Sequence, residues 1–115
     1  TITWNEGGRA MVPASHFTDL KAGAIMKLYF TQNNNWGQLQ INNGKWGGIN
    51  FSELGNNNYL TTDVINDKTI TSFELLLTEE ALGNINSNAA YGTAIIIQGS
   101  DFVIDKITLI TKSGK

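Results

Sequence analysis

Apolar and polar residues alternate along much of this chain, with the two-residue period of a half-buried β-strand. In the segment 26–31, Met26, Leu28 and Phe30 share one face, and Tyr29 lies on the other face together with a lysine and a threonine. This pattern predicts a strand with one side toward a core and one side toward solvent.

The segment 36–41 has the same alternation but a different outward face. Leu39 and Ile41 point toward the predicted core, so Trp36, Gln38 and Gln40 fall together on the opposite face. Further strands are predicted at residues 1–4, 49–51, 69–77, 93–98 and 102–110.

Short polar turns at 33–35, 42–44, 55–58 and 99–101 separate these strands. Two short helices are predicted, one over 13–20 that starts at Pro13, and one that Thr78 caps and Asn86 ends. The pattern as a whole predicts an all-β fold, an antiparallel β-sandwich of the jelly-roll type with one or two short helices. At 115 residues and 12.6 kDa, residues 1–115 are expected to form a single domain.

The charge pattern narrows the choice of partner. Eight basic and ten acidic residues give a net charge of −2, and the basic residues are scattered from Arg9 to Lys115 without a cluster. Nucleic acid and anionic membranes are therefore not expected partners, because both require a concentrated basic face. No apolar run approaches the roughly 20 residues of a membrane span, and the absence of cysteine excludes a disulfide framework and a thiolate metal site.

The tryptophans carry the most informative signal. Trp36 lies on a polar strand face, Trp46 follows an Asn-Asn-Gly turn, and Trp4 is on the first predicted strand. An indole buries about 150–250 Å² when it packs inside, so placing one among amides and glycines forfeits that burial unless a ligand covers it. A pyranose ring is a suitable cover, because its C–H face stacks on an aromatic ring while its hydroxyls reach neighbouring amides.

The neighbouring polar residues fit the same interpretation. Gln38 and Gln40 are expected about 6.5–7 Å apart on one strand face, Gln98 ends an apolar strand, and Tyr29 would extend the platform from the preceding strand. The structural alternative is that Trp36 and Trp46 only cover the core beneath loops. Trp4 alternates with Ile2 and fits a position in the core equally well. The candidate ligand-binding residues are Trp36, Trp46, Gln38, Gln40, Gln98, Tyr29 and Trp4.

Catalysis and metal binding find little support. The one histidine, His16, lies near Ser15 and Asp19 in a short predicted helix where exposure to solvent is the ordinary outcome. No pair of carboxylates stands out for the two-carboxylate chemistry of glycosidases. Turn carboxylates are the candidate ligands for a structural calcium ion, but no calcium-loop pattern is present and solvated turn residues are the favoured interpretation. Those candidates are Asp63, Asp67, Asp101 and Asp105, and no cofactor is expected.

Four stretches resemble bacterial carbohydrate-binding modules: Val-Pro-Ala-Ser-His-Phe at 12–17, Trp-Gly-Gln-Leu-Gln-Ile at 36–41 with Gly-Lys-Trp at 44–46, Ala-Ile-Ile-Ile-Gln-Gly at 94–99, and Val-Ile-Asp-Lys-Ile-Thr-Leu at 103–109. The chain is similar to the small jelly rolls of families sixty-five and eighty, which are attached to cellulases and related hydrolases. The resemblance implies a shallow cleft on one sheet that takes internal stretches of β-glucan, xyloglucan or β-mannan. It also implies ligand contact at Trp36, Trp46, Gln38, Gln40 and Gln98.

The expected function is therefore non-catalytic binding of a plant polysaccharide, which targets a covalently attached glycoside hydrolase to the plant cell wall. We expect a monomeric, extracellular bacterial domain, and the start at Thr1 rather than Met suggests a piece of a larger exported polypeptide. One alternative is a protein-interaction or structural domain of a cell-surface or multi-enzyme assembly. The other is a small hydrolase, which would release sugar by itself.

Overall fold

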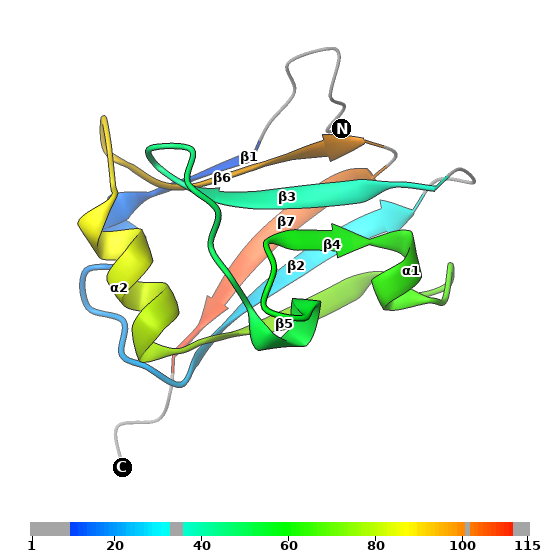
Figure 1. Ribbon diagram of the computed structural model, residues 1–115, viewed down its shortest axis with the longest axis horizontal. Helices are drawn as coiled ribbons and strands as arrows, with labels where there is room; N and C mark the ends of the chain where they lie inside the picture. Colours follow the sequence, from blue (N-terminus) through cyan, green and yellow to red (C-terminus); the bar gives the residue numbers. More distant parts are fainter. Residues whose placement is uncertain (1–9, 33–35, 101, 112–115) are drawn as a thin grey trace.

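Two antiparallel sheets face each other in the computed structural model, which describes residues 10–32, 36–100 and 102–111 (Figure 1). One sheet has the order β1 (Ala10–Pro13), β6 (Thr93–Ser100), β3 (Gln38–Asn43), β4 (Tyr59–Thr61). The other has the order β5 (Ser72–Leu77), β2 (Ala24–Gln32), β7 (Phe102–Ile110). The predicted antiparallel β-sandwich is confirmed.

The chain passes repeatedly between the two sheets. Among the strands of the described segments, β3 and β4 are the one consecutive pair that lies in the same sheet. The neighbours of a strand therefore come from distant parts of the sequence: β3 pairs with β4 on one side and with β6 on the other. This arrangement decides which outward side chains can share a surface.

The core lies between the sheets and is built from the inward side of each alternating strand. Met26, Leu28 and Phe30 of β2 are fully buried, as are Leu39 and Ile41 of β3. Phe30 meets Phe102 of β7 edge to face, with ring centroids 5.3 Å apart. Burying a side chain of this kind contributes about 1.5–3 kcal/mol relative to leaving it exposed. The apolar side chains on the inward face of the alternating strands therefore stabilise the packing of the two sheets.

The helices cover the ends of the sandwich. Figure 1 shows α2 (Glu79–Ser87) at one end and α1 (Thr62–Ile65) at the other. Thr78 caps α2 as predicted, because its Oγ1 accepts a hydrogen bond from the backbone N–H of Ala81 at 3.1 Å. Leu82 and Ile85 then turn the buried face of α2 toward the core.

Several predicted elements differ from those observed. The predicted helix over 13–20 is a single 3₁₀ turn, η1 (Ala14–His16), because Pro13 instead ends strand β1 at the edge of a sheet, where a missing N–H is tolerated. A second 3₁₀ turn is η2 (Ser52–Leu54). No strand forms at 49–51, where Phe51 makes only an isolated bridge. Strand β5 begins at Ser72 rather than 69, because Asp67 and Thr69 close a turn.

Four elements were not predicted: β1, β4, α1 and η2, each of three or four residues. The strand predicted at 1–4 lies outside the described residues. Within the segments that the structure describes, no helix is long and apolar enough to cross a membrane.

Candidate functional site

The outer face of the four-stranded sheet carries glutamine side chains on two strands and a tyrosine on a third. In register, Gln40 of β3 lies between Gln98 of β6 and Tyr59 of β4, and its Nε2 donates a hydrogen bond to Tyr59 Oη at 3.1 Å. Gln38 lies one step along β3 on the same side. All four side chains are half-buried. These residues, Gln38, Gln40, Gln98 and Tyr59, form a surface termed the glutamine face.

Trp36 lies at one end of this surface, just before β3 and in phase with Gln38. Its side chain is 52% exposed, and its indole Nε1 donates a hydrogen bond to Asp63 Oδ2 of α1 at 3.0 Å. The next residue, Gly37, donates its backbone N–H to Thr62 Oγ1 at 2.8 Å. Helix α1 therefore holds both the backbone and the ring at this end.

Trp46 lies beyond the other end of β3, with 47% of its side chain exposed. It lines a hollow together with Met11 and Ile96, which project from the outer side of β1 and β6 and pair in register with each other. Trp46 is thus on the same side of the sheet as the glutamine face. The six residues of β3 between the tryptophans rise about 20 Å in total.

A buried asparagine holds the loop of Trp46 in place. Asn43 is 4% exposed, and its Oδ1 accepts hydrogen bonds from the backbone N–H groups of Lys45 and Gly47, both at 2.9 Å. Its Nδ2 donates to Asn84 Oδ1 of α2 at 2.7 Å. These hydrogen bonds therefore hold the loop that carries Trp46 against α2.

The surface carries little charge. The carboxylate of Asp63 is joined to this surface by the hydrogen bond from Trp36. The pKa of Asp67 is lowered, first by the hydroxyl of Thr69 and then by the Thr69 backbone N–H, and these contacts stabilise the turn before β5. No three acidic or histidine side chains gather as a metal site within residues 10–32, 36–100 and 102–111. Neutral ligands suit such a surface best.

Tyr29 lies elsewhere, which corrects the expectation that it extends the platform. Its strand β2 pairs with β5 and β7, so Tyr29 belongs to the three-stranded sheet on the other side of the molecule. There its ring lies between the Nζ atoms of Lys27 and Lys106, at 5.0 Å and 4.6 Å from the ring centroid. Trp4 lies outside the described residues.

The structure adds residues that the sequence reasoning missed. Tyr59 enters the glutamine face through pairing with Gln40, and Asp63 reaches Trp36 from α1. A weak signal for the first was present, because Tyr59 and Thr61 flank the apolar Leu60 after an asparagine-rich turn. Nothing along the sequence indicates the second contact, which depends on where α1 packs.

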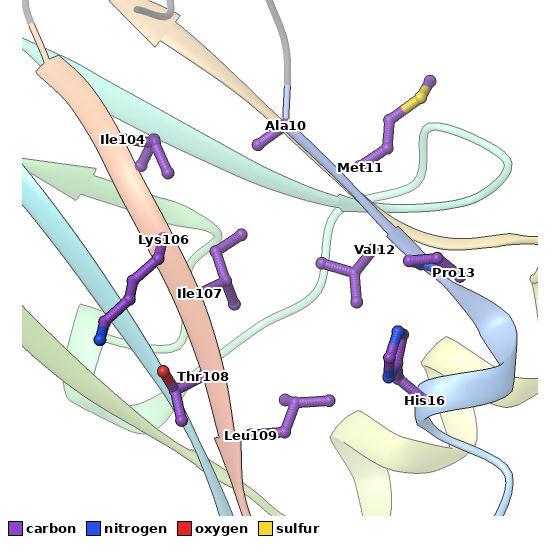
Figure 2. A pocket seen from close by; sticks show the side chains of 10 residues that line it. All are labelled: Ala10, Met11, Val12, Pro13, His16, Ile104, Lys106, Ile107, Thr108 and Leu109. Atoms are coloured by element: carbon purple, nitrogen blue, oxygen red, sulfur yellow. The ribbon is translucent and has the colours of Figure 1, made fainter.

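A hollow of about 620 Å³ lies away from the glutamine face, between the sheet edges β1 and β7 (Figure 2). Val12 points into it from β1, and Ile107 and Leu109 point into it from β7. His16 lies at its end and is exposed. The lining is mostly aliphatic, with one imidazole ring and no amide side chain, so this groove is a weaker candidate for a sugar site than the glutamine face.

No protein-family model and no curated protein matches this chain. Among solved structures, the fold is similar to SGBP-B of the Bacteroides ovatus mixed-linkage glucan utilization locus, determined in complex with a mixed-linkage heptasaccharide. The TM-score is 0.59 at 18% sequence identity, and the match covers 85% of this chain and 22% of that chain. At this identity the similarity concerns the β-sandwich fold, and the present chain spans less than a quarter of the length of the protein it matches.

Proposed function

We propose that this chain binds neutral polysaccharide without cleaving it, by laying an internal stretch of a β-glucan-type chain along the glutamine face. One observation carries the proposal. Trp36 and Trp46 each leave about half of the side chain exposed, on the same side of one sheet and at opposite ends of a row of half-buried amides. An exposed indole forfeits part of its burial free energy, and a sugar ring stacked on it restores that burial.

The chemistry of the surface suits a neutral, hydroxyl-rich chain. The indoles supply apolar planes, while the glutamines offer both donors and acceptors to hydroxyl groups. A few stacked rings at about 1–3 kcal/mol each, by analogy with bases on aromatic side chains, less the ordering costs, correspond to a dissociation constant around micromolar to millimolar. Because no charge pairing is involved, the affinity should change little with ionic strength.

The comparison with a solved structure supports the choice of ligand. The protein of similar fold was determined with a mixed-linkage heptasaccharide, so mixed-linkage β-glucan is the first ligand to test, followed by xyloglucan and β-mannan. Together with the resemblance to modules of cellulases, the fold similarity suggests that this chain is part of a larger extracellular protein. Binding would then raise the local concentration of an attached catalytic domain at the plant cell wall.

The test is affinity gel electrophoresis of the whole chain in mixed-linkage β-glucan, xyloglucan, glucomannan and xylan. Retardation in at least one gel is expected, with loss in Trp36→Ala and Trp46→Ala and an unchanged thermal midpoint. Tyr29→Ala is the matched control, since it removes an aromatic ring from the opposite sheet and should bind as the unaltered chain does. Absence of retardation in every gel, or release of reducing sugar by the isolated chain, would contradict the proposal.

A further inference from the structure

Two aromatic residues near one end of the sheet have a left-handed backbone conformation. Within the described residues, four residues other than glycine have a positive φ: Trp46 at 68°, Tyr91 at 53°, and Asn56 and Asn66. Asparagine tolerates this region, whereas a bulky aromatic residue there is a genuine outlier that lowers the stability of the fold. Such outliers cluster at functional sites, so both aromatic residues call for an explanation.

The turn at Tyr91 shows the conflict most clearly. Ala90 and Thr93 exchange both backbone hydrogen bonds, at 3.0 Å and 2.9 Å, which closes a two-residue hairpin turn over Tyr91 and Gly92. Both central residues have positive φ, as in the turn type that favours Asn-Gly. Tyr91 occupies the asparagine position with its side chain fully exposed. The protein therefore gains no packing from this ring that would offset the backbone strain.

The turns of Trp46 and Tyr91 touch each other through Gly44. A methyl group added to Gly44 would overlap the carbonyl oxygen of Thr93 and the backbone nitrogen of Ala90, so only glycine permits this approach. Figure 1 shows both turns at the same end of the sandwich as α2. The close approach places Trp46 and Tyr91 on the rim of the same hollow, of about 280 Å³.

The floor of this hollow is apolar and separate from the core. Ile96 is 3% exposed, yet it lies on the outer side of β6 and is not part of the cluster between the sheets. Met11 pairs with it from β1 and is exposed. Lys45 and Thr93, an amine-bearing and a hydroxyl-bearing residue, also line the hollow. An apolar floor, two aromatic rings and two hydrogen-bonding groups match the apolar face and hydroxyl edge of one pyranose ring.

We propose that this hollow, formed by Trp46, Tyr91, Met11 and Ile96, is a separate sugar subsite that takes the next ring of a glycan chain lying along the glutamine face. The inference rests on the proposed function. Trp46 lines it from the loop after β3, and Tyr91 lines it from the turn before β6, at the expense of backbone strain. The subsite lengthens the binding surface past the end of β3, so it contributes only to chains long enough to reach it.

Tyr91→Asn tests the subsite, because asparagine suits the left-handed conformation and the ring it replaces is exposed. Calorimetry with mixed-linkage tetrasaccharide and heptasaccharide is the measurement. The unaltered chain should bind the heptasaccharide more tightly, and the variant should lose about tenfold of that affinity, the effect of one stacked ring. Its thermal midpoint should rise. Tyr91→Phe keeps the ring and should retain the affinity for the heptasaccharide.

The outcomes separate this inference from the proposed function. If Tyr91→Asn binds the heptasaccharide as the unaltered chain does, while Trp36→Ala does not bind it, the subsite is refuted and the function stands. If the unaltered chain binds neither oligosaccharide but is retarded in a polysaccharide gel, the subsite is refuted and the function stands; if it is also not retarded in any gel, both are refuted. A lower thermal midpoint in Tyr91→Asn would show that the tyrosine serves the fold, and would likewise overturn the subsite.

Discussion

Trp36 and Asp63 are joined by a hydrogen bond from indole Nε1 to carboxylate Oδ2, 3.0 Å long, between residues 27 positions apart in the chain. Both residues lie at the surface, so the bond adds little to the stability of the fold. The hydrogen bond instead orients the ring. A half-exposed indole has few packing neighbours that restrict its rotamers, and the hydrogen bond to α1 selects one rotamer. The ring is thereby ready to stack before a ligand arrives.

Asp63→Ala should weaken glycan binding while leaving the fold intact. The indole of Trp36 would regain rotamer freedom, and the lost pre-organisation should lower the affinity for mixed-linkage β-glucan about three- to tenfold, or about 0.7–1.4 kcal/mol. Calorimetry gives the affinity, and near-ultraviolet circular dichroism reports the ordering of the ring. Asp63→Asn keeps a side-chain acceptor and should bind nearly as the unaltered chain does. Equal affinity in all three proteins would show that Trp36 needs no orienting partner.

Asn43→Ala should destabilise the protein and weaken binding together. The change leaves the N–H groups of Lys45 and Gly47 without their acceptor and removes one of the two donors to Asn84 Oδ1, the other being Asn88 Nδ2. Each unpaired polar group at such a site costs up to about 1–3 kcal/mol. We therefore expect the free energy of unfolding to fall by about 2–4 kcal/mol in total, as measured by urea unfolding.

The matched control for Asn43 is Asn50→Ala, the same chemical change at an exposed position. It should alter the free energy of unfolding by no more than about 0.5 kcal/mol. If Asn43→Ala leaves retardation in β-glucan gels unchanged at a temperature where it is folded, the loop of Trp46 does not depend on this asparagine.

Thr78→Ala should affect stability alone. The substitution removes the acceptor for the Ala81 N–H at the start of α2, a loss of about 1 kcal/mol for a capping residue. Thermal and urea unfolding check the size, and Thr78→Ser, which keeps the hydroxyl, should restore most of it. Glycan affinity should stay the same, because the hydrogen bonds between α2 and the loop of Trp46 are made by Asn84, more than one helical turn after Thr78. A fall in affinity in folded Thr78→Ala would mean that the whole of α2 supports the site.

Asp67 should give the protein part of its acid sensitivity. The Thr69 hydroxyl, followed by the Thr69 N–H, lowers the pKa of this carboxyl below 3.8, so the folded state keeps it ionised to lower pH than the unfolded chain does. The stabilisation is fully present above 3.8 and is lost as the pH falls through the lowered pKa.

The thermal midpoint of Asp67→Asn should therefore lie below that of the unaltered chain at pH 6, and the gap should close as the pH falls below 3.8. Thr69→Val, which removes the hydroxyl donor, should reduce the same pH dependence. A gap that is constant from pH 6 downward would contradict the assignment.

Much of the fold could be predicted because the longer strands alternate strongly. The segment 102–110 was predicted with the bounds that β7 has, and β2 extends the predicted 26–31 at both ends. The common side of Trp36, Gln38 and Gln40 likewise follows from alternation along one strand. Strands β1 and β4 were missed because three or four residues carry too little periodic signal, and Pro13 also favoured a helix start.

The composition of the candidate site was less accessible. Tyr29 was assigned to the platform because consecutive strands usually lie side by side, whereas here the chain crosses to the other sheet between β2 and β3. Tyr91 did carry a signal, an aromatic residue before glycine between a predicted helix and a predicted strand. Its relation to the site became visible only from the positive φ of Tyr91 and the close approach of the two turns at Gly44.

The sequence by itself determined which side of each long strand faces the core, and with it the exposed row Trp36, Gln38 and Gln40, because alternation is a property of neighbouring residues along one strand. The tertiary structure alone decided that Gln98 and Tyr59 flank Gln40, that Asp63 reaches Trp36, and that Tyr91 and Trp46 line the same hollow. Those relationships depend on strand register and on the packing of two sheets, which bring together residues that no local pattern connects.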